Sequence, residues 1–184
     1  MSDQLEVLKT IAKHLDVLDT PYMVTGSLAA SYYAVPRFTR DIDIVVEIDT
    51  RRAVQLAHDL ADEFYVDEKA LLRAVARSGM ANIIHQRLLV KVDLIVRKDT
   101  PYRREELVRR RSVVLDGVTV WLVTPEDLIL SKLLWMRESR SEIQRRDVES
   151  VLASVQHLDR QYIERWATEL NVLGMWREVS SAAE

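Results

Sequence analysis

The sequence contains no cysteine, which excludes disulfide bonds, thiolate metal sites and cysteine nucleophiles. It also lacks an excess of one charge. Its 26 basic and 29 acidic side chains give a formal net charge of −3, which excludes an overall basic coat for nucleic acid. No apolar run approaches the roughly 20 residues that a membrane helix needs, and the charged N-terminal segment has no signal-peptide core. We therefore expect a cytoplasmic protein that does not contact a membrane.

Glycine and proline are scarce, with four residues of each, so each one is informative about chain boundaries. Gly26 separates a short β-rich segment from a helical one. Asp116-Gly117 lies between two β-rich runs, which is typical of a hairpin. Thr124-Pro125 has the features of a helix start, with a capping side chain followed by proline at the first helical position.

The spacing of apolar residues predicts the other elements. We expect helices at 4–18, 28–34, 50–64, 68–78, from 101, and at 125–138, 141–156 and 159–170, and strands at 22–25, 41–48, 81–85, 88–96 and on both sides of 116–117. The first part mixes helices and strands, whereas the part after Val123 is helical. This order predicts an α+β protein with a mixed lobe at 1–123 and a helical C-terminal lobe at 124–184.

Two aspartates lie on one predicted strand. Asp41 and Asp43 are two residues apart in a run rich in Ile and Val, so a strand would place both carboxylates on one face, roughly 6.6 Å apart. A divalent cation would remove their repulsion, and oxygen ligands are those that Mg²⁺ prefers. The alternative is an exposed strand face with two solvated acids.

A glycine–serine pair precedes these aspartates. Gly26-Ser27 lies where a short strand meets a helix. A glycine there lets the backbone approach a phosphate, and the N–H groups of a helix start can bind it. The alternative is an ordinary turn in which Ser27 caps the helix.

A third acid, Asp93, lies on a later predicted strand whose opposite face is apolar. If this strand pairs beside 41–48, Asp93 joins the other two carboxylates. Three clustered carboxylates can hold two magnesium ions, and Asp93 could also accept the proton of an attacking hydroxyl. The alternative is an exposed aspartate paired with Lys91 or Arg97.

Taken together, these segments resemble the nucleotidyltransferases of the DNA polymerase beta superfamily. The resemblance is carried by residues 24–27, 36–44 and 92–95. The Arg-x-Thr-Arg-Asp-Ile-Asp sequence at 37–43 is most similar to the AbiEii-type nucleotidyltransferase toxins. The stretch at 124–133, followed by 145–148, is similar to the helical lobe of those proteins.

The resemblance implies a polymerase-beta-like fold, in which helices flank a small mixed sheet, and the magnesium-dependent transfer of a nucleotidyl group from an NTP. Two Mg²⁺ ions are implied, with Mn²⁺ as a substitute. The implied site residues, by role, are Asp41, Asp43 and Asp93 as metal ligands and catalytic residues, with Asp93 also as the base, Lys132 as a catalytic residue at the phosphate, and Gly26, Ser27, Arg37, Thr39, Arg40 and Asp147 as nucleotide-binding residues. Arg37 and Arg40 could instead bind the acceptor or pair with nearby acids.

The acceptor group is a hydroxyl or a phosphate, and the acceptor itself stays open between RNA or tRNA, a protein and a small molecule. The arginine-rich run at 103–111 is either a solvated helix face or a surface that follows the phosphates of an RNA. The AbiEii-type resemblance implies a toxin that a partner antitoxin neutralises. The competing hypothesis is a member of the superfamily that has lost catalysis and binds a nucleotide or a partner. The retained carboxylates argue against it, because a dead site has no physical need for repelling acids.

Overall fold

The computed structural model describes residues 3–36, 41–139 and 141–182. Its strands are β1 (Tyr22–Thr25), β2 (Asp41–Val46), β3 (Phe64–Val66), β4 (Met80–His85), β5 (Lys91–Val96), β6 (Arg111–Leu115) and β7 (Val118–Leu122). Its helices are α1 (Asp3–Val17), α2 (Gly26–Tyr33), α3 (Thr50–Leu60), α4 (Glu68–Arg77), α5 (Pro101–Arg109), α6 (Pro125–Ser139), α7 (Glu142–Ser154), α8 (Arg160–Glu169) and α9 (Leu173–Ala182).

All the described strands form one mixed sheet in the order β3-β4-β5-β2-β1-β7-β6. The central strand β2 runs parallel to β5 and antiparallel to β1. The Asp116-Gly117 hairpin is confirmed: both residues have positive φ, 48° and 80°, as a two-residue turn of this kind requires. The sheet therefore agrees with the predicted α+β class.

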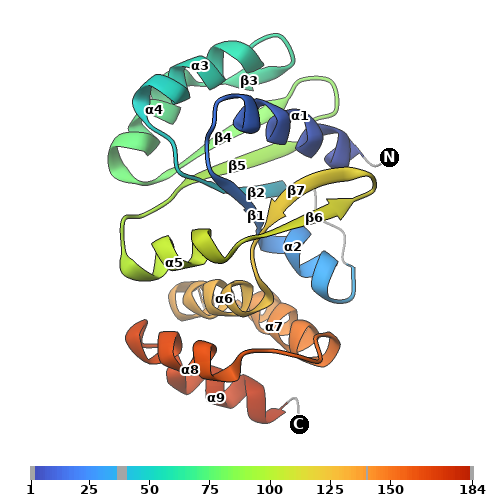
Figure 1. Cartoon of the computed structure of the whole chain (residues 1–184), viewed down its shortest axis with the longest axis vertical. Coiled ribbons are helices and arrows are strands. Elements are labelled where there is room, and N and C mark those ends of the chain that lie inside the picture. Colours follow the sequence, from blue (N-terminus) through green and yellow to red (C-terminus); the bar gives the residue numbers. More distant parts are fainter. Residues whose placement is uncertain (1–2, 37–40, 140, 183–184) are drawn as a thin grey trace.

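Helices cover both faces of the sheet (Figure 1). In this view α1, α3 and α4 lie above the sheet, and α2 and the C-terminal helices lie below it. Helix α2 packs on β1 and β2 and also contacts α6 and α7. The side chains of Ile42, Ile44 and Val92 are fully buried, and they alternate along their strands with Asp41, Asp43 and Asp93. The three acids therefore share the face on which α2 lies.

One predicted helix was too long, and one helix was missed. The helix expected at 50–64 ends at Leu60, and Phe64 begins the short strand β3. The Phe64 ring is buried with its centroid 4.8 Å from that of His85 on the paired strand β4, so strand pairing at this sheet edge overrides the helical spacing. In addition, α9 was not predicted as a separate helix.

One hydrophobic core extends through both predicted lobes, with buried residues from Val7 on α1 to Val179 on α9. The described part of the chain has no strand after Leu122, which agrees with the helical character expected there. The division into lobes at residue 123 stays a prediction, because the core crosses it. Among the described helices, none has the length and apolar character needed to span a membrane.

Candidate active site

The sheet register brings the three predicted acids together. Asp43 lies opposite Asp93 on β5 and opposite Thr25 on β1. The parallel pairing of β2 with β5, on which the prediction for Asp93 depended, is therefore confirmed. Asp93 is more enclosed than an exposed aspartate would be, with 7% of its surface accessible.

Gly26 is required by the position of Asp43. Its φ is +65°, a conformation that L side chains rarely adopt, and a Cβ built on it would lie 1.9 Å from Oδ2 of Asp43. The carboxylate of Asp43 thus reaches into the space that a side chain at residue 26 would occupy. The glycine brings the first turn of α2 directly against the acid cluster.

The start of α2 is suited to an anion. Its N-cap residue, Thr25, forms no side-chain capping hydrogen bond with the helix, and its first turn contains no acidic residue. Backbone N–H groups at a helix start attract negative charge. Ser27 lies inside this first turn, after the N-cap, so the alternative in which Ser27 caps the helix was wrong.

Lys91 stands between two of the acids. Its Nζ lies 3.0 Å from Oδ2 of Asp41 and 3.1 Å from Oδ2 of Asp93. The hydrogen bonds to Asp41 and Asp93 raise the pKa of Lys91 against the opposing effect of its burial. Arg97 pairs instead with Glu47 and Asp99. The sequence offered Lys91 or Arg97 as a partner for Asp93. Lys91 does contact Asp93, and it also connects Asp93 to Asp41.

The cluster disfavours charge on Asp43. Burial raises the pKa of Asp43, and the nearby carboxylates of Asp93 and Asp41 raise it further, while Lys132 and Lys91 oppose them. A cation bound between the acids would relieve this repulsion. Both the position of the three acids and the raised pKa of Asp43 therefore favour the binding of a cation between them.

The residues fit a magnesium site by their chemistry. Their donors are carboxylate oxygens, and Oδ1 of Asp93 is buried with no hydrogen-bond partner among the described residues. Within the described ranges, no three His, Asp or Glu side chains form a ready ligand group for one ion. Lys91 stands between Asp41 and Asp93, so a cation would enter this gap only after its ammonium group moves.

The two candidates from the helical lobe bind each other. Nζ of Lys132 lies 2.6 Å from Oδ2 of Asp147 and donates a 3.0 Å hydrogen bond to Gln144. This pair is buried, and the charge of Lys132 still lowers the pKa of Asp43. Asp147 therefore lies beside Lys132 and holds it. The remaining candidates Arg37, Thr39 and Arg40 fall outside the described residues.

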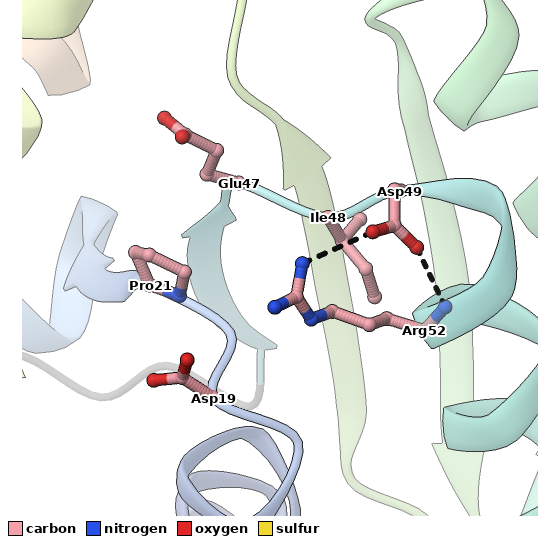
Figure 2. Close-up of a pocket in the computed structure, with 6 residues that line it drawn as sticks. All are labelled: Asp19, Pro21, Glu47, Ile48, Asp49 and Arg52. Atoms are coloured by element: carbon pink, nitrogen blue, oxygen red, sulfur yellow. Dashed lines mark hydrogen bonds and ion pairs between the residues drawn. The ribbon is translucent and has the colours of Figure 1, made fainter.

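A surface pocket lies elsewhere. It is lined by Asp19, Pro21, Glu47, Ile48, Asp49 and Arg52 (Figure 2). Glu47 and the two residues after it follow the end of β2, whereas Asp41 and Asp43 are at its beginning. Arg52 is bound to Asp49 at 3.0 Å, so its guanidinium is already paired. This pocket is not part of the acid cluster.

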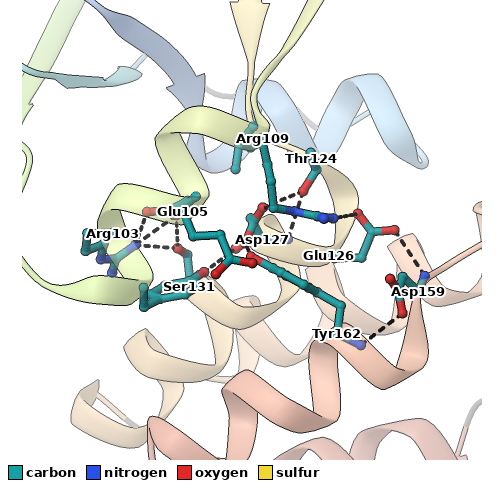
Figure 3. Close-up of polar contacts among 12 residues, drawn as sticks. Arg103, Glu105, Arg109, Thr124, Glu126, Asp127, Ser131, Asp159 and Tyr162 are labelled. Atoms are coloured by element: carbon teal, nitrogen blue, oxygen red, sulfur yellow. Dashed lines mark hydrogen bonds and ion pairs between the residues drawn. The ribbon is translucent and has the colours of Figure 1, made fainter.

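Three arginines of the run at 103–111 are paired with carboxylates, and Figure 3 shows two of them, Arg103 and Arg109. Arg103 donates two 2.8 Å bonds to Glu106, and Arg109 contacts Glu126 and Asp127. Arg104 pairs with Asp99. The contacts of Arg109 join α5 to the start of α6, whereas the carboxylate partners of Arg103 and Arg104 lie on α5 and just before it. Each of these three arginines already has a carboxylate partner, whereas Arg110 donates to the carbonyl of Leu107. A phosphate-binding role of the run stays a prediction.

An exposed apolar surface, which the sequence analysis missed, borders Asp93. Asn82 on β4 lies opposite Asp93, and the same face of the sheet carries Met80, Ile84 and Tyr65. Their exposed fractions are 53%, 37% and 64%, respectively. The alternation of side chains in the Met80–His85 segment could have indicated this surface. Ala81, Ile83 and His85 are buried on one face of the strand, so the residues between them lie on the exposed face.

Comparison with known families gives one match. The model described as "Nucleotidyltransferase of unknown function (DUF6036)" matches residues 2–177. No curated protein matches the sequence.

Solved structures with a similar fold include three nucleotidyltransferase-type proteins. An antigenic nucleotidyltransferase-like protein from Paracoccidioides brasiliensis has 19% identity and a TM-score of 0.60, with 97% of this chain and 90% of that chain covered. ANT(2″)-Ia in complex with adenylyl-2″-tobramycin has 14% identity and a TM-score of 0.62, with 92% and 98% covered. The lincosamide antibiotic adenylyltransferase LnuA has 11% identity and a TM-score of 0.53, with 80% and 96% covered. These similarities show a nucleotidyltransferase fold.

Proposed function

The chain belongs to the DUF6036 family of nucleotidyltransferases, and on this premise we propose that it transfers an NMP group from an NTP to a hydroxyl of an acceptor, with Asp41, Asp43 and Asp93 as its magnesium ligands. The observation that carries the proposal is the alignment of Asp43 with Asp93 across β2 and β5, directly against Gly26. Mg²⁺, or Mn²⁺ in its place, would polarise the phosphate and lower the pKa of the attacking hydroxyl.

The residues of the chain divide the remaining work. Gly26 and the start of α2, with Ser27 in its first turn, hold the triphosphate. Asp93 accepts the proton of the acceptor hydroxyl, whose oxygen forms a bond to the α-phosphorus as the bond to the β-phosphate breaks and pyrophosphate leaves. Lys132, held by Asp147, adds positive charge beside Asp43.

For the acceptor we propose a small hydroxyl-bearing molecule. The support is the exposed face beside Asp93, which consists of the uncharged side chains of Tyr65, Met80, Asn82 and Ile84. An apolar surface of this kind suits an acceptor with an apolar face and not a polyanion. Two structures of the same fold hold adenylyl-2″-tobramycin and lincomycin.

Label transfer tests the activity and the acceptor together. The protein is incubated with Mg²⁺ and each α-³²P-labelled NTP in a cell extract that is then separated into RNA, protein and small-molecule fractions. We expect label in the small-molecule fraction, and its loss in Asp43→Asn and Asp93→Asn. Label in RNA or protein would overturn the acceptor proposal alone. Transfer that persists in both variants would overturn the proposed site.

The alternative is a catalytically inactive module that binds a nucleotide or a partner. Label transfer combined with thermal melting distinguishes this module from an active enzyme. A ligand at about 100 times its Kd stabilises the folded state by roughly 2.7 kcal/mol. Stabilisation by NTP and Mg²⁺ without any label transfer would favour the inactive module.

The AbiEii-type assignment leads to a narrower proposal, a toxin neutralised by an antitoxin. It is supported by the sequence resemblance at 37–43 and 124–133. Its test is growth after induced expression, where arrest that Asp41→Ala abolishes is the expected result. Normal growth at high expression would reject the toxin role and leave nucleotidyl transfer untouched.

A further inference from the structure

Lys91 is held in the acid cluster by the backbone. It is the first residue of β5 and lies opposite Asp41 in the parallel register, two residues before Asp93. Residues two apart on a strand share a face, so its ammonium group lies on the side of the three carboxylates. Its side chain is 34% exposed, whereas that of Asp93 is 10% exposed. Its position is therefore a product of the register and not of a chance surface contact.

The charge balance assigns a role to this lysine. Asp41, Asp43 and Asp93 carry three negative charges when ionised. Lys91 contacts two of them, at 3.0 Å and 3.1 Å, so its ammonium group occupies the gap between Asp41 and Asp93 and supplies a positive charge there. The positive charge of Lys132 also acts on Asp43. A divalent cation bound beside these ammonium groups is repelled at short range, and a second divalent cation would be repelled by the first as well.

We propose that the ammonium group of Lys91 permanently occupies the space between Asp41 and Asp93 and takes the place of one metal ion. The nucleotide-free protein then binds one divalent ion and not the two that three carboxylates would otherwise bind. Oδ1 of Asp93, which is buried and has no hydrogen-bond partner in the described part of the chain, remains for that ion. This inference rests on the metal site of the proposed function, but it is independent of the acceptor.

The test counts bound ions directly. Mn²⁺ is titrated into nucleotide-free protein, and the free ion is measured by electron paramagnetic resonance. We expect one bound ion for the wild type and two for Lys91→Met. The first ion should bind about 10- to 100-fold more tightly in Lys91→Met, because a nearby positive charge is gone. Lys91→Arg, which keeps the charge, should still bind one ion.

Lys98→Met is the matched control, because Lys98 is exposed and lies beyond the end of β5; it should bind one ion. Far-UV circular dichroism checks each fold, and Lys91→Gln replaces Lys91→Met if the latter unfolds. Two ions in the wild type, or one in the neutral variants, would overturn the role of Lys91 alone. No bound ion in any of the proteins would overturn the proposed metal site together with it.

Discussion

At the scale of single residues, the site depends on a close fit between a glycine and an acid. The Asp43 carboxylate occupies the place where a Cβ of residue 26 would be, and Gly26 has a positive φ. Neither feature tolerates a larger residue without movement of the strand or the helix. Asp43 also lies close to Asp93 and Asp41, whose charges raise its pKa. Its immediate neighbours therefore determine both the position and the ionisation of Asp43.

Gly26→Ala should therefore abolish nucleotidyl transfer and lower stability. The methyl group would overlap Oδ2 of Asp43, and the positive φ alone costs roughly 1–2 kcal/mol for a residue with a side chain. Urea denaturation and label transfer measure the two effects. Gly174→Ala is the control, since nothing lies within 4 Å of a Cβ at that position. A fully active Gly26→Ala protein would contradict this account.

Asp43→Asn should make the metal-free protein more stable near neutral pH. Because the pKa of Asp43 is raised above its ordinary 3.8 in the folded state, its contribution to stability is present at low pH and is lost as the pH rises through the raised pKa. An amide avoids this loss, so Asp43→Asn should unfold at a higher urea concentration than the wild type near neutral pH.

The measurement is the free energy of unfolding in EDTA from pH 4 to 7.5. The advantage of Asp43→Asn should shrink as the pH falls toward the ordinary carboxyl range. Asp62→Asn, at an exposed position, should show no such trend. Equal stability of the wild type and Asp43→Asn over the whole range would contradict the repulsion argued for this cluster.

At the scale of elements, the start of α6 connects the helical segment to the sheet. Thr124 caps the helix: its Oγ1 accepts from the backbone N–H of Asp127 at 3.2 Å and donates to Oδ2 of Asp127 at 2.7 Å. Tyr162 on α8 donates to Oδ1 of Asp127 at 2.6 Å, and Nε of Arg109 on α5 lies 3.2 Å from Oδ2 (Figure 3). One fully buried carboxylate thus joins α5, α6 and α8.

Asp127→Ala should be strongly destabilising, by about 3–5 kcal/mol, since it leaves the buried partners of the carboxylate unsatisfied. Thermal or urea denaturation measures the loss. Asp99→Ala removes an acid that is paired with Arg97 and Arg104 at an exposed position and should have little effect. Similar stability of the two variants would show that the network is not a structural junction.

At the scale of the whole molecule, acidic and basic side chains are nearly equal in number, and three described arginines of the run at 103–111 are paired with carboxylates. The formal net charge is −3, and Arg103, Arg104 and Arg109 each have a carboxylate partner. The apolar face beside Asp93 is the surface next to the cluster that lacks charge. These features favour an acceptor that is held by contact area and not by counterion release.

Acceptor binding should therefore depend weakly on salt. Between 50 and 200 mM salt, a protein that contacts many phosphates of a nucleic acid loses about 10³- to 10⁵-fold in affinity. We expect a change of less than about tenfold in the KM for the acceptor labelled in the extract. A steep dependence on salt would indicate a polyanionic acceptor. Titration of the NTP alone separates any effect on nucleotide binding.

Much of the fold could be predicted from local patterns. The Asp116-Gly117 hairpin and the Thr124 cap follow from residues adjacent in the chain, and the helical spacing of α1 and α4 is strong. The strand at Phe64 could not be predicted in this way. Phe64, its first residue, continues the apolar spacing of the preceding helix, and the strand is recognised from its pairing with β4.

The sequence by itself determined which chemistry is available: Asp41 and Asp43 share a strand face by their spacing, and a glycine precedes a helix upstream. The tertiary structure decided which of these groups meet. The parallel pairing of β2 and β5 places Asp93 opposite Asp43 and brings Lys91 to Asp41, across about fifty residues of chain. Spacing along a strand sets the direction of a side chain, whereas strand order and register depend on how the whole core packs.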